Sequence, residues 1–115
     1  MRICICGGRD LDNYAYVRWS LNHLINTASR PTIITGGARG TDTLAIHWAD
    51  EYHLETEVYP ANWQKYGRSA GYIRNEQMLD TGLDLVIAFP GGKGTAMMVD
   101  IAKRAGVEVI IVPNP

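Results

Sequence analysis

Glycine-rich segments that carry a cation recur three times in this chain of 115 residues, and each could cradle a phosphate group. Glycine lets the backbone approach a ligand and expose successive N–H groups, and a helix that follows adds the positive end of its dipole. The segments are Gly7-Gly8-Arg9-Asp10, Gly36-Gly37-Ala38-Arg39-Gly40-Thr41-Asp42 and Pro90-Gly91-Gly92-Lys93-Gly94-Thr95. One such segment is typical of a tight turn. Three of them, each with a cation, favour an anion-binding site.

A fourth group of residues lies in and after an irregular stretch from 60 to 71. Arg74 and Asn75 could hold a phosphate or read the edge of a base. Trp63 or Tyr66 could stack on a base, and packing within the loop is an equally good explanation for both aromatics.

Three side chains of the glycine-rich segments could either bind a ligand or cap a helix. Thr41 and Thr95 could donate a hydroxyl to a ligand or cap the helices that follow them. Asp42 could accept a hydrogen bond from a ribose hydroxyl, although an acidic residue in a first helical turn is more often a capping or dipole partner. The sequence leaves both roles open for Asp42.

The elements that must position these residues alternate between strand and helix. Continuous apolar runs predict five strands, whereas helical spacing of apolar residues predicts the segments between them. The predicted strands are Ile3 to Cys6, Thr32 to Thr35, Glu57 to Tyr59, Leu85 to Phe89 and Val107 to Val112. The predicted helical stripes are Tyr14 to Ala28, Leu44 to Tyr52, Ser69 to Thr81 and Met97 to Ala105.

This alternation predicts an α/β fold: a Rossmann-like, doubly wound, mainly parallel five-stranded sheet with helices on both faces, in a single domain spanning 1–115. Ligands of such sheets bind outside the carboxyl ends of the strands. The glycine-rich segments follow the first, second and fourth strands, so we expect them to meet at one edge. The last four residues, 112–115, are expected to fray.

Composition limits the classes of function. A net charge of −1 provides no global field for a polyanion, so an anion site must be local. No apolar stretch approaches the length of a membrane span and the chain enters a strand at once, so we expect a cytoplasmic protein. Cys4 and Cys6 are expected to be buried, reduced packing residues. We assign no function to the histidines and expect neither a metal nor a cofactor.

The glycine spacing excludes two common nucleotide motifs. The chain has no G-x-x-x-x-G-K-[ST] run, and the segment after the first strand is not G-x-G-x-x-G. These absences argue against a P-loop NTPase and a standard dinucleotide fingerprint.

Four segments together resemble the SLOG superfamily, which joins the DNA-processing protein A and Lonely Guy families. The likeness is greatest to the small YspA-related branch of bacteria and phages, and it covers nearly the whole chain in the same order. The resemblance implies a Rossmann-like sheet whose glycine loops bind nucleotides or nucleotide-derived signals, commonly in a dimer. The segments are residues 7–10, 35–42, 74–78 and 89–95.

Lonely Guy enzymes cleave the bond between a base and ribose 5′-monophosphate and carry the signature P-G-G-x-G-T-x-x-E, with an arginine from R-[KN]-x-x-M. The resemblance places Arg74 and Met78 on that arginine segment, but Met98 stands where the glutamate is expected. An oxocarbenium-like transition state needs a carboxylate, which a thioether cannot replace. Asp100 is turned by about 200° from position 98 on a helix, which leaves Asp10 and Asp42 as candidates.

Three functional hypotheses follow. We favour a binding protein that holds a nucleotide, a cyclic nucleotide or an NAD-derived signal as a sensor or a sink, in a homodimer or higher homo-oligomer. The alternative is a nucleotide N-glycosidase or phosphoribohydrolase that uses Arg74 with Asp10 or Asp42. A protein associated with single-stranded DNA ranks third, because the near-neutral charge and the lack of a basic stripe oppose it.

Overall fold

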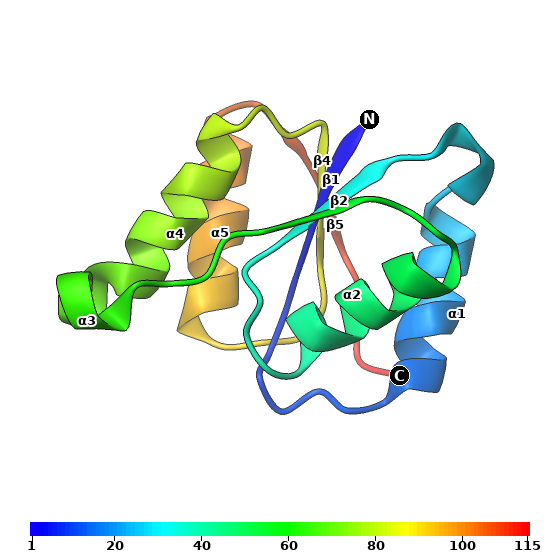
Figure 1. Cartoon of the computed structure of the whole chain (residues 1–115), viewed down its shortest axis with the longest axis horizontal. Helices are drawn as coiled ribbons and strands as arrows, with labels where there is room; N and C mark the ends of the chain where they lie inside the picture. The colour runs from blue at the N-terminus through cyan, green and yellow to red at the C-terminus, as the bar shows by residue number, and fades with distance from the viewer.

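The sheet of this computed structural model, which describes residues 1–115, has five strands in the order β3-β2-β1-β4-β5. All four neighbouring pairs are parallel, which confirms the predicted α/β architecture. Figure 1 views the sheet from its edge, with helices on both sides. The strands are β1 (Arg2–Cys6), β2 (Thr32–Thr35), β3 (Thr56–Val58), β4 (Leu85–Ala88) and β5 (Glu108–Ile111).

Two helices cover each face of the sheet. Helices α1 (Tyr14–Leu24) and α2 (Thr41–Glu51) pack on one face, and α4 (Ala70–Asp80) and α5 (Lys93–Arg104) pack on the other. Side chains of a strand alternate between the two faces. Ile3 and Ile5 therefore enter the core below α1 and α2, while Cys4 and Cys6 enter the core below α4 and α5. Both cysteines are buried and free, as expected for packing residues.

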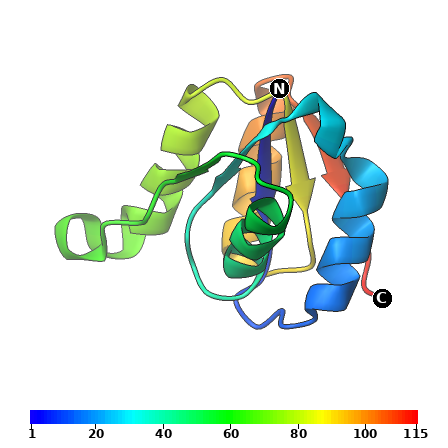
Figure 2. The same cartoon turned by 45° about the vertical axis from the view of Figure 1, so that its right-hand side comes forward.

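The helices differ from the predicted stripes at two places. Helix α1 ends at Leu24, and the residues after it form a 3₁₀ turn, η1 (Thr27–Ser29). The stretch that we expected to be irregular contains a short helix, α3 (Trp63–Tyr66), followed by a 3₁₀ turn, η2 (Gly67–Ser69). Asn62 accepts a hydrogen bond from Lys65 N–H and caps α3, which explains why so short a segment is helical. Figures 1 and 2 both show α3 standing away from the sheet at the start of α4.

The chain order reverses between β1 and β4, which are neighbours in the sheet. Crossovers from β1 run to one side of this pair and those from β4 to the other, so a crevice opens between the loops at their carboxyl ends. The loops after β1 and β4 touch there, because Gly8 N–H donates to Pro90 O at 2.8 Å.

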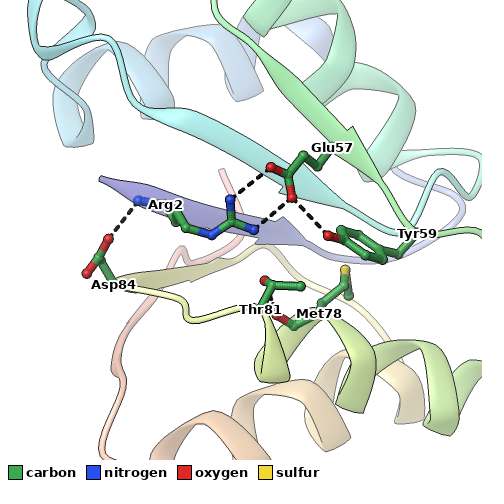
Figure 3. Close-up of polar contacts among 6 residues, drawn as sticks. All are labelled: Arg2, Glu57, Tyr59, Met78, Thr81 and Asp84. Carbon is green, nitrogen blue, oxygen red and sulfur yellow. Dashed lines mark hydrogen bonds and ion pairs between the residues drawn. The ribbon is translucent and has the colours of Figure 1, made fainter.

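A polar network links β1 to β3 (Figure 3). Arg2 donates two hydrogen bonds to the Glu57 carboxylate, at 2.9 and 2.7 Å, and Tyr59 OH donates a third at 2.9 Å. These donors stabilise the charged form of Glu57 and lower the pKa of its carboxyl to about 2. The network ties β1 to the edge strand β3.

The carboxyl terminus is held more firmly than we expected. Val112 is buried and its N–H donates to Ala88 O at 2.8 Å, which extends the pairing of β4 and β5. The hydroxyl of Tyr16 also donates to Pro113 O. The prediction of a frayed end from residue 112 is therefore wrong for its first two residues. No helix in the structure combines the length and hydropathy needed to cross a bilayer.

Candidate ligand-binding site

A cavity of about 880 Å³ opens at the carboxyl edge of the sheet, above the crevice between β1 and β4. Residues from all four segments that the sequence singled out line it, although they lie far apart in the chain. The lining includes the catalytic candidate Asp10 and thirteen of the residues that we predicted to bind a ligand: Gly7, Gly8, Arg9, Gly36, Asp42, Arg74, Asn75, Pro90, Gly91, Gly92, Lys93, Gly94 and Thr95.

Four residues predicted to bind the ligand lie outside this lining: Gly37, Arg39, Gly40 and Thr41. The exposed Arg39 forms an ion pair with the exposed Asp10 at 3.3 Å. Thr41 is fully buried, and its Oγ1 donates to Gly8 O at 3.0 Å. The helix that follows the second glycine segment thus uses its first threonine to hold the neighbouring loop.

The loops after β1 and β2 interlock through backbone contacts that leave no room for a side chain. Gly40 has a φ of +78°, and a Cβ there would lie 2.5 Å from the carbonyl oxygens of Gly8 and Arg9. A Cβ on Gly7 would lie 2.5 Å from Thr41 Oγ1. The N-terminus of α2 is also occupied, since Thr41 N–H donates to Gly8 O at 3.1 Å. Glycine is needed here for packing, whatever the loops bind.

The loop after β4 has a different environment. A Cβ on Gly92 or Gly94 would meet no atom of the protein within 4 Å, yet both residues line the cavity. Helix α5 starts here without a side-chain cap. The first backbone hydrogen bond of the helix runs from Ala96 N–H to Gly92 O. The amide groups before Ala96 are therefore free to bind an anion. Packing explains neither glycine, and Gly94 lies inside the helix, where capping does not explain it either.

Arg74 and Asn75, in the first turns of α4, connect the second loop to the fourth. Arg74 Nη1 donates to Gly36 O at 2.9 Å, and its Nε donates to Asn75 Oδ1 at 3.1 Å. The buried Asn75 donates in turn to Gly94 O at 3.1 Å. These bonds hold the guanidinium of Arg74 beside the start of α5 and leave its Nη2 without a hydrogen bond in the chain.

The cavity has a positive local charge in a chain that is nearly neutral overall. Four cationic side chains line it (Arg9, Arg68, Arg74 and Lys93), and none has a carboxylate within ion-pairing distance. Two carboxylates face them, so the lining has a net charge of +2. This local excess is what an anionic ligand needs.

The two carboxylates differ sharply in environment. Asp10 is exposed on the rim, whereas Asp42 is only 7% exposed and lies in the first turn of α2. Burial raises the pKa of the Asp42 carboxyl, while the hydrogen bond from Ala38 N–H and the charges of Arg74 and Arg9 oppose that rise. Asp42 accepts a hydrogen bond from Ala38 N–H in the loop before α2, and it also lines the cavity.

Two exposed aromatic side chains line the outer part of the cavity. Trp63 is 49% exposed and Tyr72 is 53% exposed. The guanidinium of Arg9 lies 5.6 Å from the centre of the Trp63 ring. Tyr66, the other predicted stacking residue, is outside the lining.

Several lining residues were not found from the sequence, notably Arg68, Tyr72, Met97 and Asn114. Arg68 lies in η2 just before α4 and Tyr72 lies in the first turn of α4, and neither belongs to a glycine motif. Asn114 arrives from the terminal segment that we expected to fray. A search for cations and aromatics around Arg74 could have found Arg68 and Tyr72, but no local signal marks Asn114.

Met98 is fully buried and packs in the core between the sheet and α4 and α5, with one side at the cavity floor. Asp100 lies outside the lining and pairs with Arg104 at 3.1 Å. Asp100 therefore does not bring a carboxylate into the cavity in place of the signature glutamate. Nor does any group of three His, Cys, Asp or Glu side chains lie close enough to hold a metal ion.

Comparison with known families agrees with the sequence resemblance. The family model of YspA, cpYpsA-related SLOG proteins matches residues 1–66, which carry the first two glycine loops. The Gene 61 protein of Mycobacterium phage D29 is 36% identical to this chain over 85 residues, which is 68% of each protein.

Solved structures share the fold at low sequence identity. A molybdenum cofactor binding protein from the phototrophic bacterium Rippkaea orientalis superposes with a TM-score of 0.76 at 22% identity, over 99% of this chain and 77% of that one. The protein TM1055 superposes with a TM-score of 0.73 at 16% identity, over 94% of this chain and 71% of that one. The likeness to both extends over almost the entire sheet and its helices.

Proposed function

We propose that this chain, which belongs to the YspA, cpYpsA-related SLOG family, binds a nucleotide or a nucleotide-derived ligand in the cavity at the carboxyl edge of its sheet. In this proposal the protein is a sensor or a sink that holds the ligand without cleaving it. The ligand's phosphate lies against the start of α5.

The observation that carries the proposal is the uncapped N-terminus of α5. Free amides, two glycines with open space at Cβ and the side chain of Lys93 come together there at the cavity wall. Inside the first turn of α5, Gly94 lowers helix stability relative to alanine, so a glycine that no packing requires there calls for another cause. Close approach of a phosphate to the backbone supplies it.

The order of contacts across the cavity supports an orientation for the ligand. Asn75 connects the start of α5 to Arg74, and Arg74 lies on the same side as Asp42, whose charge it stabilises. Beyond Asp42 come Arg9 and then the exposed ring of Trp63. Phosphate, sugar and base would follow one another along this line, with the base stacked on an aromatic ring.

Glycosidic cleavage is the second candidate, and the buried Met98 weighs against it. Its thioether cannot stabilise an oxocarbenium-like state or activate water. Asp10 is exposed and paired with Arg39, and Asp42 already accepts a bond from Ala38 N–H. The cavity thus keeps the cradle of a phosphoribohydrolase without its carboxylate in the expected place.

Mass spectrometry of the small molecules bound to the purified protein tests the proposal. The protein would be analysed as isolated and after incubation with nucleoside monophosphates, cyclic nucleotides and NAD-derived compounds, beside an Arg74→Ala control. We expect an intact nucleotide to be enriched on the wild-type chain and lost from the control. Free base with ribose phosphate would instead identify a glycosidase. If the protein neither retains nor alters any of the compounds, both functions are contradicted.

A further inference from the structure

The buried carboxylate of Asp42 lines the cavity and has acceptor capacity that the protein does not fill. Ala38 N–H donates to Oδ2 at 3.1 Å, and a backbone hydrogen bond from Gly36 also favours the charged form. No side chain of the protein donates a hydrogen bond to this carboxylate.

An ionised carboxylate has room for about four hydrogen bonds and cannot donate any. Asp42 is more than nine-tenths buried, yet it lines the cavity, where a ligand can use its remaining acceptor capacity. Two cations, Arg74 and Arg9, lie near enough to favour its charged form. The carboxylate is therefore a strong acceptor at the cavity wall.

The position of Asp42 limits what that donor can be. A phosphate carries negative charge and would be repelled by the carboxylate, which is consistent with its place at the far side, beside α5 and Arg74. The aromatic rings that suit a base lie beyond Arg9. Between phosphate and base a nucleotide offers only its sugar, whose 2′ and 3′ hydroxyls are neutral donors.

We propose that Asp42 accepts a hydrogen bond from a 2′ or 3′ hydroxyl of the sugar, so that the site selects ribonucleotides over deoxyribonucleotides. This inference rests on the proposed function, because it assigns the specificity of the same cavity. It adds a prediction that nucleotide binding alone does not make: removing one hydroxyl from the ligand should weaken binding, even though the phosphate and the base are unchanged. Asp42 then acts as a specificity-determining residue.

Isothermal titration calorimetry of the full chain tests this inference. The probes are the four common ribonucleoside 5′-monophosphates, each with its 2′-deoxy and 3′-deoxy counterparts. For any ribonucleotide that binds, we expect at least one deoxy counterpart to bind about tenfold more weakly or worse, as is typical of a lost hydrogen bond to a charged group. Equal binding of all three members of a set would overturn the role of Asp42 and leave the proposed function standing. If no member of any set binds, this inference is overturned for nucleoside monophosphates, whereas the proposed function is contradicted only if cyclic nucleotides and NAD-derived compounds also fail to bind.

Two variants separate recognition from folding. Asp42→Asn keeps the shape of the side chain and an oxygen that can accept from Ala38 N–H, but it removes the charge. We expect the ratio of ribonucleotide to deoxyribonucleotide affinity to fall toward one in Asp42→Asn. In Asp100→Asn, a carboxylate outside the cavity is changed in the same way and the ratio should stay at the wild-type value. An unchanged ratio in Asp42→Asn, with thermal unfolding like that of the wild type, would also overturn the proposal.

Discussion

The loops after β1 and β2 resemble the loop after β4 in sequence but differ from it in what surrounds their glycines. Gly7, Gly8 and Gly40 are pressed against neighbouring backbone or side chains, so a Cβ at any of them would collide with the protein. Gly92 and Gly94 face open space in the cavity. The first set is needed for folding, whereas the second set is needed only if a ligand approaches.

The two helix N-termini differ in the same way. Helix α2 begins against the carbonyl of Gly8, which accepts from both the N–H and the hydroxyl of Thr41. Helix α5 begins with neither a side-chain cap nor a carbonyl from another loop. A glycine-rich loop followed by a helix is therefore an anion site only where the amides remain free.

The largest effect is expected for Gly40→Ala. The new Cβ would collide with the carbonyls of Gly8 and Arg9, at a backbone conformation that favours glycine, so we expect a loss of at least about 3 kcal/mol in the free energy of unfolding. Urea denaturation measures it. Gly106 has the same φ of +78° but open space at Cβ, so Gly106→Ala is the matched control and should cost only about 1 kcal/mol. Equal losses in the two variants would show that the loops are not interlocked.

Arg74→Ala is expected to weaken nucleotide binding by about tenfold or more, because it removes a charge-assisted contact from the cavity wall. Arg39→Ala removes the same charge from an exposed ion pair outside the lining, and we expect a change within about threefold. Calorimetry with a bound nucleotide compares the two. A larger loss in Arg39→Ala would mean that the ligand extends beyond the cavity described above.

Gly94→Ala separates stability from binding. Alanine is favoured over glycine in a helix, and nothing in the protein obstructs a Cβ at this position, so we expect unfolding to cost about 0.5 to 1 kcal/mol more. Nucleotide affinity should fall in the same variant, because the methyl group narrows the approach to the amides. Thermal unfolding and calorimetry on one preparation measure both, and a variant that is more stable and binds as well as the wild type would count against a phosphate at this loop.

The smallest effect is expected at the polar network of Arg2 and Glu57, which lies outside the cavity lining. Glu57→Gln should lower stability near neutral pH by about 0.5 to 1 kcal/mol, since its bonds with Arg2 are only partly buried. The pKa of Glu57 is about 2 in the folded chain and 4.5 ordinarily, so the wild type keeps this stabilisation above pH 4.5 and loses it as the pH falls toward 2. The free energies of unfolding of the wild type and of Glu57→Gln, plotted against pH, should therefore converge as the pH falls from 4.5 toward 2. Nucleotide affinity at neutral pH should not change in Glu57→Gln. A change in affinity would show that the Arg2 and Glu57 network is coupled to the cavity.

The order of strands and helices and the edge at which the loops meet could be predicted from the sequence, because apolar runs and glycine segments are local signals. The distinction between packed and open glycines could not, since it depends on contacts such as those between Gly40 and Gly8 across the fold. Arg39 and Lys93 look alike in sequence, yet only Lys93 lines the cavity. Tyr72 and Asn114 enter the lining from helix and tail, without a motif to mark them.

The most direct test of the central claim is the affinity of Gly92→Val for the nucleotide that the wild-type chain binds most tightly, measured with the unfolding midpoint of both proteins. A Cβ at this position meets no protein atom within 4 Å, and valine is a poorer N-cap residue than glycine, so we expect the unfolding midpoint to fall only slightly. Its side chain would occupy the approach to the free amides of α5, and we expect affinity to fall by about tenfold or more. A variant that binds the nucleotide as tightly as the wild type would show that the phosphate does not bind at the start of α5.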